Sequence, residues 1–329
     1  MRTSSRLLAG SGVLVVSLLL TACGTRTTGA EAGPSSSAGR CGEVRGDAGD
    51  LARDGVRITG AVEREGAAGG PGEAGASAGV PEGLVRAERL PTAGGRRCSV
   101  RYSVTNDAAE PYTYTVVFSL LDEQGRALSN VTETVPGVGA GRTVRRTLDT
   151  GGGLGEPTRT RILDVKKVPS AEAPAAAGDC PASGLRLTAD DGDAAMGLRV
   201  VGLHLENCGS RPYALYGYPV VGLLDDALRP VGGVEILRGT GDIPMAGDSE
   251  PPRPLTLPPG GAAAATLAWR NTTEAGEPVT VPYVRVRPKE GADPVIVAPN
   301  LDLGTTGRLG VSAWREAATA GNSDRPRGS

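Results

Sequence analysis

The chain has 329 residues, enough for about two domains, and it carries 50 glycines, 25 prolines and a formal net charge of −2. Aromatic residues make up 3% of it and there is one histidine, which disfavours a histidine-rich metal centre, an aromatic nucleic-acid platform and a helical bundle. Acidic and basic residues nearly balance, so the sequence supplies no basic stripe for phosphates and we expect no nucleic-acid partner.

The chain begins with the pattern of a secretory signal. Arg2 and Arg6 form the charged start, and Leu7–Leu20 is a mostly apolar stretch, shorter than the ~18 residues that a membrane-spanning helix needs. The segment Leu20–Gly24 then resembles the lipobox of bacterial lipoproteins, which implies acylation of Cys23. Two acyl chains anchor a protein stably, so we expect Cys23 to hold the chain at the outer face of the cytoplasmic membrane.

Alternating apolar and polar residues predict antiparallel strands. Every second residue of Cys98–Val104 is apolar, and the apolar residues of Thr113–Leu121 also share one face. Further strands are expected, in chain order, at Arg142–Leu148, Ile162–Val168, Leu185–Leu187, Leu198–Leu205, Val220–Leu224, Ala263–Trp269, Val281–Arg287, Val295–Val297 and Leu309–Trp314. No stretch has sustained helical periodicity, so the prediction is an all-β fold of two tandem Ig-like antiparallel sandwiches.

Composition divides the chain into segments. Stretches rich in glycine, alanine, serine and proline predict a flexible tether after the signal, a linker between the sandwiches and a disordered tail. The expected boundaries are 1–22 for the lipoprotein signal peptide, 23–40 for the tether, 41–169 for the N-terminal sandwich, 170–179 for the linker, 180–315 for the C-terminal sandwich and 316–329 for the tail.

The two predicted sandwiches share a pattern of turn residues. Each has an asparagine, a proline five residues later and then an aspartate, at Asn106, Pro111 and Asp122 and at Asn207, Pro212 and Asp225. We expect the asparagine to cap a turn through its side chain, the proline to open a strand and the aspartate to start another turn. Each segment then has a turn before its next strand, at Pro136-Gly137 and at Pro258–Gly261. The pattern is typical of an internal repeat of one sandwich unit.

Five motifs in the second segment carry a family resemblance: Cys180–Leu187, Gly192–Arg199, Leu205–Ser210, Leu215–Pro219 and Leu257–Gly260. In this order they resemble the domain of unknown function 4232 family, found mainly in secreted proteins and lipoproteins of actinobacteria. The resemblance covers about residues 180–315, and it implies an Ig-like sandwich with no known catalytic residues.

The first segment resembles the small Ig-like domains of bacterial lipoproteins. The resemblance rests on Val104–Asn106, Leu121–Gly125 and Val138–Val144. Such domains are generally binding or assembly modules, and this is the role that the resemblance implies.

Four cysteines remain besides Cys23, and an even number in an exported chain suggests disulfides. Three pairings are possible, and the division into two domains favours Cys41–Cys98 with Cys180–Cys208. A zinc site is disfavoured because the chain has no C-x-x-C motif and a single histidine.

The sequence offers little support for catalysis. We expect His204 on the solvent side of its strand, and a lone histidine makes a catalytic triad unpersuasive. Gly75–Gly79 matches G-x-S-x-G but lies in a glycine- and alanine-rich stretch without the strand and helix that a nucleophile elbow needs. Asp190–Asp193 lacks calcium-loop spacing and is interpreted as a solvated turn. We expect no enzyme activity, no cofactor and no metal.

Six of the seven tyrosines cluster at similar places in the two segments. Tyr102 and Tyr114 share the apolar strand face and are predicted to lie in the core, whereas Tyr213, Tyr216 and Tyr218 are candidates for a contact surface. The expected function is a non-catalytic binding or scaffolding module with a protein partner in the envelope. A solute- or glycan-binding lipoprotein and a purely structural envelope protein remain alternatives.

Two short basic pairs, Arg145-Arg146 and Lys166-Lys167, are interpreted as exposed strand ends.

Overall fold

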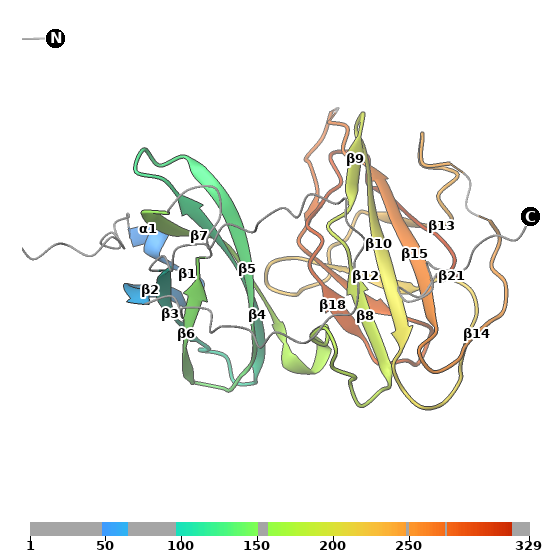
Figure 1. Cartoon of the computed structure of the whole chain (residues 1–329). Coiled ribbons are helices and arrows are strands. Elements are labelled where there is room, and N and C mark those ends of the chain that lie inside the picture. Colours follow the sequence, from blue (N-terminus) through green and yellow to red (C-terminus); the bar gives the residue numbers. More distant parts are fainter. Residues whose placement is uncertain (1–47, 65–96, 151–156, 248–249, 274, 318–329) are drawn as a thin grey trace, which may run out of the picture. The chain divides into compact units, whose positions relative to one another are not determined.

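The computed structural model describes residues 48–64, 97–150, 157–247, 250–273 and 275–317 (Figure 1). They all belong to one of the two compact units into which the chain divides, Gly39–Ser329. Within these ranges no helix has the length and apolar character needed to cross a membrane. The predictions for the signal peptide, the tether, Cys23, Cys41 and Gly75–Gly79 lie outside the described residues.

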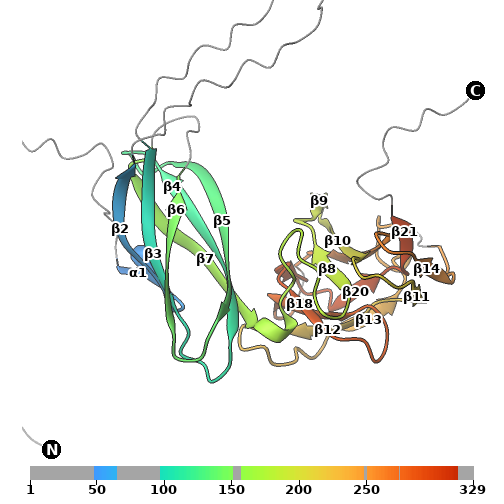
Figure 2. The same ribbon diagram turned by 60° about the horizontal axis from the view of Figure 1, so that its bottom comes forward.

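The first sandwich consists of two antiparallel sheets, which Figure 2 shows as separate layers. One sheet has the order β1-β2-β3-β6, with β1 at Ala52–Arg53, β2 at Val56–Arg64, β3 at Arg97–Thr105 and β6 at Thr143–Asp149. The other has the order β5-β4-β7, with β5 at Ala127–Val138, β4 at Tyr112–Leu121 and β7 at Arg159–Pro169. The four-residue helix α1, Ala48–Leu51, precedes them.

Side chains from both sheets form the core of the first sandwich. Tyr102 of β3 and Phe118 of β4 are buried against each other, with ring centroids 4.9 Å apart. The alternating residues of β4 are also buried, as predicted, at Tyr114, Val116, Phe118 and Leu120. The prediction that Tyr102 and Tyr114 lie in the core is therefore confirmed.

A larger sheet forms one layer of the second sandwich. Its order is β13-β20-β15-β10-β8, with bounds Glu235–Arg238, Arg308–Val311, Ala262–Arg270, Leu198–Asn207 and Leu185–Ala189. Two short strands extend it, since β9 (Asp193–Ala195) pairs with β10 and β21 (Arg315–Ala317) pairs with β15. Among the described pairs of this sheet, β13 with β20 is parallel and the others are antiparallel.

The facing layer of the second sandwich is the three-stranded sheet β12-β17-β18, at Val220–Leu224, Tyr283–Arg287 and Val295–Val297. Two strand pairs complete the fold: β11 (Tyr213–Leu215) with β14 (Leu255–Leu257), and β16 (Thr280–Val281) with β19 (Leu301–Asp302). The buried core between the layers includes Leu203, Leu205, Leu267, Val284 and Val286. The expected all-β fold of sandwiches is confirmed.

Some strand predictions need correction. Pro136 and Gly137 lie inside β5 rather than in a turn. A proline is tolerated there because β5 is the edge strand of its sheet, where a backbone N–H can face solvent instead of a neighbouring strand. The turn comes later, where Arg142 N donates to Gly139 O at 3.1 Å. The pair Arg145-Arg146 lies in the middle of β6 and not at a strand end, although both residues are exposed.

Three strands of the second sandwich also end differently from the prediction. The expected strand Val281–Arg287 is divided at Pro282, which has no backbone N–H for a ladder bond. The strand expected over Leu309–Trp314 ends at Val311. Strand β21 continues to Ala317, two residues into the segment expected to be a disordered tail.

The segment between the sandwiches and the start of the second one carry two tertiary links. The 3-10 helix η1, Ser170–Glu172, brings Glu172 to Arg285 of β17, whose Nε donates to Oε2 at 2.6 Å. Cys180 forms a disulfide with Cys208, which closes a loop with a sequence separation of 28 residues. The second predicted disulfide depends on Cys41 and therefore lies outside the described residues.

Corresponding strand pairs support the predicted repeat. In each sandwich the strand that leads to the shared asparagine pairs with two neighbours, β2 and β6 around β3, and β8 and β15 around β10. The aspartate turns also match. Asp122 accepts from Arg126 N and Nε at 2.8 and 2.7 Å, and Asp225 accepts from Arg229 N and Nε at 2.9 and 3.0 Å.

Candidate functional site

The turn between β11 and β12 separates the three candidate tyrosines. Tyr216 is 63% exposed, whereas Tyr213 and Tyr218 are half-buried. Gly217 follows Tyr216 with φ +92°, a left-handed conformation that favours glycine and reverses the chain. Of the three residues that were predicted to form a contact surface, the turn thus presents Tyr216 most fully to solvent.

Lys289 supports the β11 side of this turn. Its Nζ donates to Ala214 O at 2.8 Å and lies 4.3 Å from the centroid of the Tyr213 ring, a cation–π distance. Burial raises the pKa of Tyr213, so this side chain stays neutral under ordinary conditions. Tyr213 is thereby a fixed part of the base of the turn rather than a free contact residue.

Trp314 supports the β12 side of the turn. It is 2% exposed, its backbone N donates to Gly217 O at 3.0 Å, and its Nε1 donates to Pro288 O at 2.8 Å. Residues far apart in the sequence therefore hold the backbone on both sides of Tyr216. Sequence analysis missed Lys289 and Trp314, because no local pattern places residues 289 and 314 beside residues 214 and 217.

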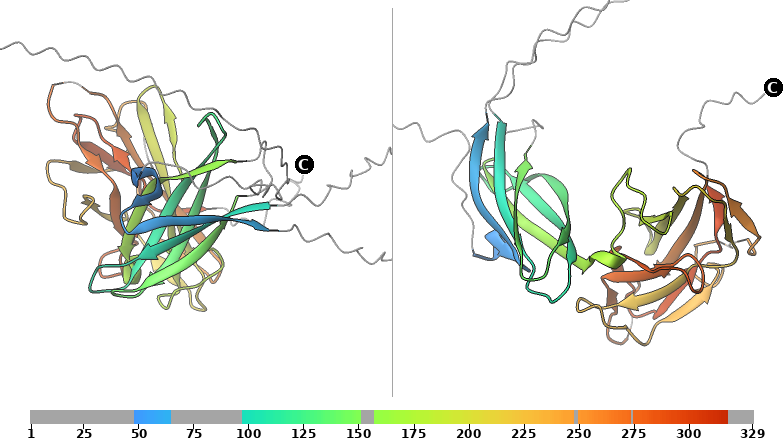
Figure 3. Two further views of the ribbon diagram at one scale, coloured as in Figure 1. Left: turned by 90° about the vertical axis from the view of Figure 1, so that its left-hand side faces the viewer. Right: turned by 90° about the horizontal axis from the view of Figure 1, so that it is seen from below.

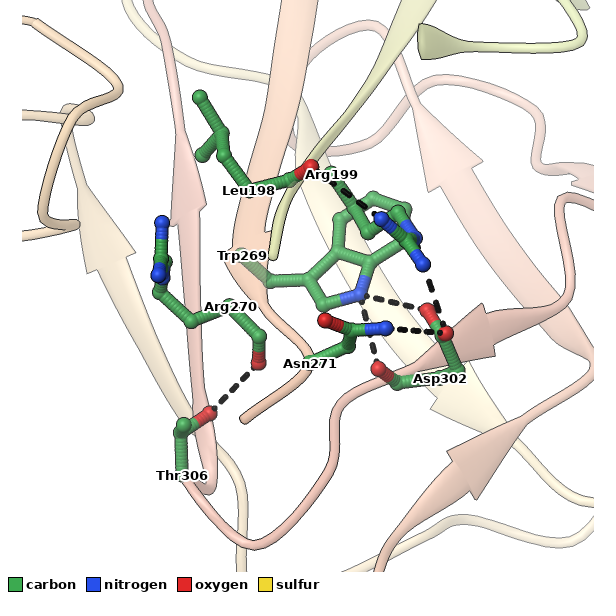
Figure 4. A network of polar contacts seen from close by, with 7 residues as sticks. All are labelled: Leu198, Arg199, Trp269, Arg270, Asn271, Asp302 and Thr306. Atoms are coloured by element: carbon green, nitrogen blue, oxygen red, sulfur yellow. Dashed lines mark hydrogen bonds and ion pairs between the residues drawn. The ribbon is translucent and has the colours of Figure 1, made fainter. Parts of the chain in front are cut away.

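A second group of polar contacts surrounds the buried ring of Trp269 (Figure 4). Trp269 Nε1 donates to the backbone O and to Oδ1 of Asp302, at 3.0 and 3.1 Å. Asn271 Nδ2 donates to Oδ2 of the same carboxylate at 3.0 Å, and Arg199 Nε lies 3.7 Å from it. Asp302 therefore joins β10, β15 and β19 at one end of the sandwich.

A cavity of about 340 Å³ opens beside this network. Arg199 is the basic residue in its wall, and the indole of Trp269 contributes apolar surface. Its further polar lining comes from Asp191, Asp193, Asn300 and Asp302. The wall carries three carboxylates and one guanidinium group, a polar lining that suits a small polar solute.

The second sandwich matches a known family: residues 180–315 correspond to the family described as "Domain of unknown function (DUF4232)". The second sandwich belongs to this family. The match confirms the resemblance that the sequence motifs predicted, and the DUF4232 domain contains the disulfide, the Tyr216 turn and the Trp269 cavity. No curated protein shows significant similarity to the chain.

The single histidine of the DUF4232 domain lies on its solvent face, as predicted. The side chain of His204 is 52% exposed and its Nε2 lies 3.1 Å from Asp190 Oδ2. Asp190 Oδ1 accepts from Gly202 N and Gly192 N, at 2.8 and 3.0 Å. Partial burial alone would raise the pKa of Asp190, but the hydrogen bonds from Gly202, His204 and Gly192 outweigh it and lower the pKa.

The Asp190–Asp193 turn thus uses its first carboxylate to hold the backbone of β10. Within the described ranges no group of three or more histidine, cysteine, aspartate or glutamate side chains is arranged to hold a metal ion.

Proposed function

We propose that this chain is a non-catalytic binding or scaffolding protein of the cell envelope, anchored to the outer face of the cytoplasmic membrane by acylated Cys23. The observation that carries the binding role is the Tyr216 turn of the DUF4232 domain, where an exposed aromatic side chain stands on a fixed backbone. The signal pattern and the lipobox-like segment Leu20–Gly24 support the anchor.

A fixed turn favours binding because less conformational freedom is lost when a partner is bound. Tyrosine is enriched among the residues that dominate protein interfaces, since its ring supplies contact area and its hydroxyl supplies a hydrogen bond. Lys289 and Trp314 contact the turn without covering Tyr216, so the ring is free to enter a pocket of a partner protein.

Crosslinking in intact cells tests this proposal. Wild-type chain is compared with Tyr216→Ala, and Met196→Ala is the matched control because Met196 is 81% exposed in the same domain. We expect one crosslinked envelope protein with the wild type and the control, and its loss with Tyr216→Ala. The same crosslinked species in all three would reject the turn as the contact surface.

The anchor is tested separately by mass spectrometry of the mature N-terminus. We expect a diacylated or triacylated Cys23 as the first residue. A chain that retains Met1, or that carries an unmodified Cys23, would contradict the lipoprotein assignment and leave the result for Tyr216 unaffected.

The cavity beside Trp269 favours a second candidate function, the binding of a small polar solute. Here we expect a small-molecule panel to raise the melting temperature of the wild type, and Arg199→Gln to remove the shift. Tyr216→Ala would leave this shift unchanged. A purely structural protein would show neither a crosslinked partner nor a ligand shift.

A further inference from the structure

Three arginines share the outer face of the first sheet of the first sandwich, which is turned toward the viewer in Figure 3 (left). Strand register places Arg57 of β2 and Arg145 of β6 on either side of Ser103. Neighbouring strands lie about 4.8 Å apart, so the Cα atoms of Arg57 and Arg145 are about 10 Å apart. Arg101 lies two residues from Ser103 on the same face, and all three arginines are exposed. We call Arg57, Arg101 and Arg145 the arginine face.

The guanidinium group of Arg101 lies across the neighbouring strand at Gly60. A Cβ atom at residue 60 would come within 3.2 Å of Arg101 Nη2, and the register of β2 with β3 shifts between Ile58 and Gly60. The glycine therefore leaves room for the guanidinium group of Arg101 beside β2. Among the described residues, none of the three arginines of this face forms an ion pair.

Hydroxyl side chains and one carboxylate lie beside the arginines. Thr105 and Thr143 approach each other across β3 and β6, with their Oγ1 atoms 2.9 Å apart. The other exposed or half-buried positions on this face are Thr59, Ser103, Thr147 and Asp149, whereas Ser99 is buried. Each of these four side chains is polar. A protein interface normally has an apolar and aromatic centre, so a cationic, hydroxylic and flat face fits polar headgroups better than a protein partner.

We propose that the arginine face docks the first sandwich on an anionic bilayer surface, with the guanidinium groups binding lipid phosphates. A guanidinium group can bind two oxygens of one phosphate at once. This inference rests on the proposed anchor at Cys23. The 25 peptide units from Cys23 to Ala48 span at most about 90 Å, so the anchor would keep the first sandwich near headgroups.

Vesicle sedimentation with residues 39–329 tests the proposal, because this unit contains the sandwiches and lacks both the signal and Cys23. One set of vesicles contains phosphatidylglycerol and phosphatidylcholine in equal parts, and the other contains phosphatidylcholine alone. We expect binding to the anionic vesicles at 50 mM salt and its loss at 1 M, where the Debye length falls to about 3 Å.

Substitution of all three arginines of the face by alanine should weaken binding about 100-fold, since each arginine near an anionic surface contributes about fivefold. The matched control replaces Arg211, Arg238 and Arg253 of the second sandwich, which are also exposed, and should bind like the wild type. Equal binding by both triple variants, or no preference for anionic vesicles, would overturn the proposal.

A protein partner would be favoured, and the proposal overturned, by two results together. The wild type would bind no vesicles, and the variant without the three arginines would lose a crosslink to an acidic protein in cells. Because residues 39–329 carry no acylation site at Cys23, failure of the anchor is detected only in the mass-spectrometry experiment. The two failures are therefore distinguishable.

Discussion

Asn106 and Asn207 hold equivalent buried positions in the two sandwiches and make the same three hydrogen bonds to the backbone. Each Nδ2 donates to the carbonyl four residues later, and each also donates to a carbonyl of a distant strand, all at 2.8 Å, with acceptors Glu110, Val138, Arg211 and Leu257. Each Oδ1 accepts from the backbone N two residues later, at Ala108 and Gly209. One side chain thus ends a strand, closes a turn and ties it to another strand.

Replacing Asn207 by alanine should destabilise the DUF4232 domain by about 3 kcal/mol. The change removes three hydrogen bonds and leaves the carbonyls of Arg211 and Leu257 without their buried donor. Urea unfolding measures the loss. Asn207→Asp keeps the acceptor for Gly209 but not the donor, and should cost nearly as much. A loss no larger than that of Asn130→Ala, at an exposed position of β5, would contradict this account.

Removal of the Cys180–Cys208 disulfide should lower the free energy of unfolding by about 3.5 kcal/mol. In the loop-entropy model a bridge with a sequence separation of 28 residues stabilises the fold by roughly this amount, because it restricts the unfolded chain. Urea unfolding of the Cys180→Ser, Cys208→Ser double variant gives the measured value. Peptide mapping without reducing agent checks the pairing directly, and a peptide that joins Cys98 to Cys180 would refute it.

Two buried tyrosines should respond oppositely to loss of the hydroxyl. Tyr102 Oη is buried and has no hydrogen-bond partner among the described residues, and burial raises its pKa to about 12. Tyr114 Oη donates to Thr105 O at 3.3 Å. We expect Tyr102→Phe to be neutral or stabilising and Tyr114→Phe to cost about 1 kcal/mol in thermal unfolding. The reverse order would show that the Tyr102 hydroxyl is satisfied.

Asp190 should contribute to loss of stability in acid. Its pKa is lowered in the folded chain, so its contribution is complete above the ordinary aspartate value near 3.8 and disappears as the pH falls through the lower folded value. We expect Asp190→Asn to flatten the dependence of unfolding free energy on pH below about 4. The neighbouring exposed Asp191→Asn is the control, and an unchanged slope in Asp190→Asn would exclude this role.

Much of the strand content could be predicted, because a half-buried strand repeats every two residues along the chain. The period was sufficient to predict the buried face of β4, from Tyr114 to Leu120, and the exposure of His204. Local turn chemistry likewise predicted the roles of Asn106 and Asn207, since an asparagine that caps a turn bonds to residues close in sequence. Motif order was enough to identify the DUF4232 domain.

The sequence by itself therefore determined the β class, the repeated turns and the family of the second sandwich. Only the tertiary structure decided which distant residues meet. Lys289 and Trp314 reach the Tyr216 turn, Asp302 reaches Trp269, and Arg57 lies in register with Arg145, because strand pairing brings together residues far apart in the chain. Register depends on the packing of whole sheets, and no local pattern of residues records it.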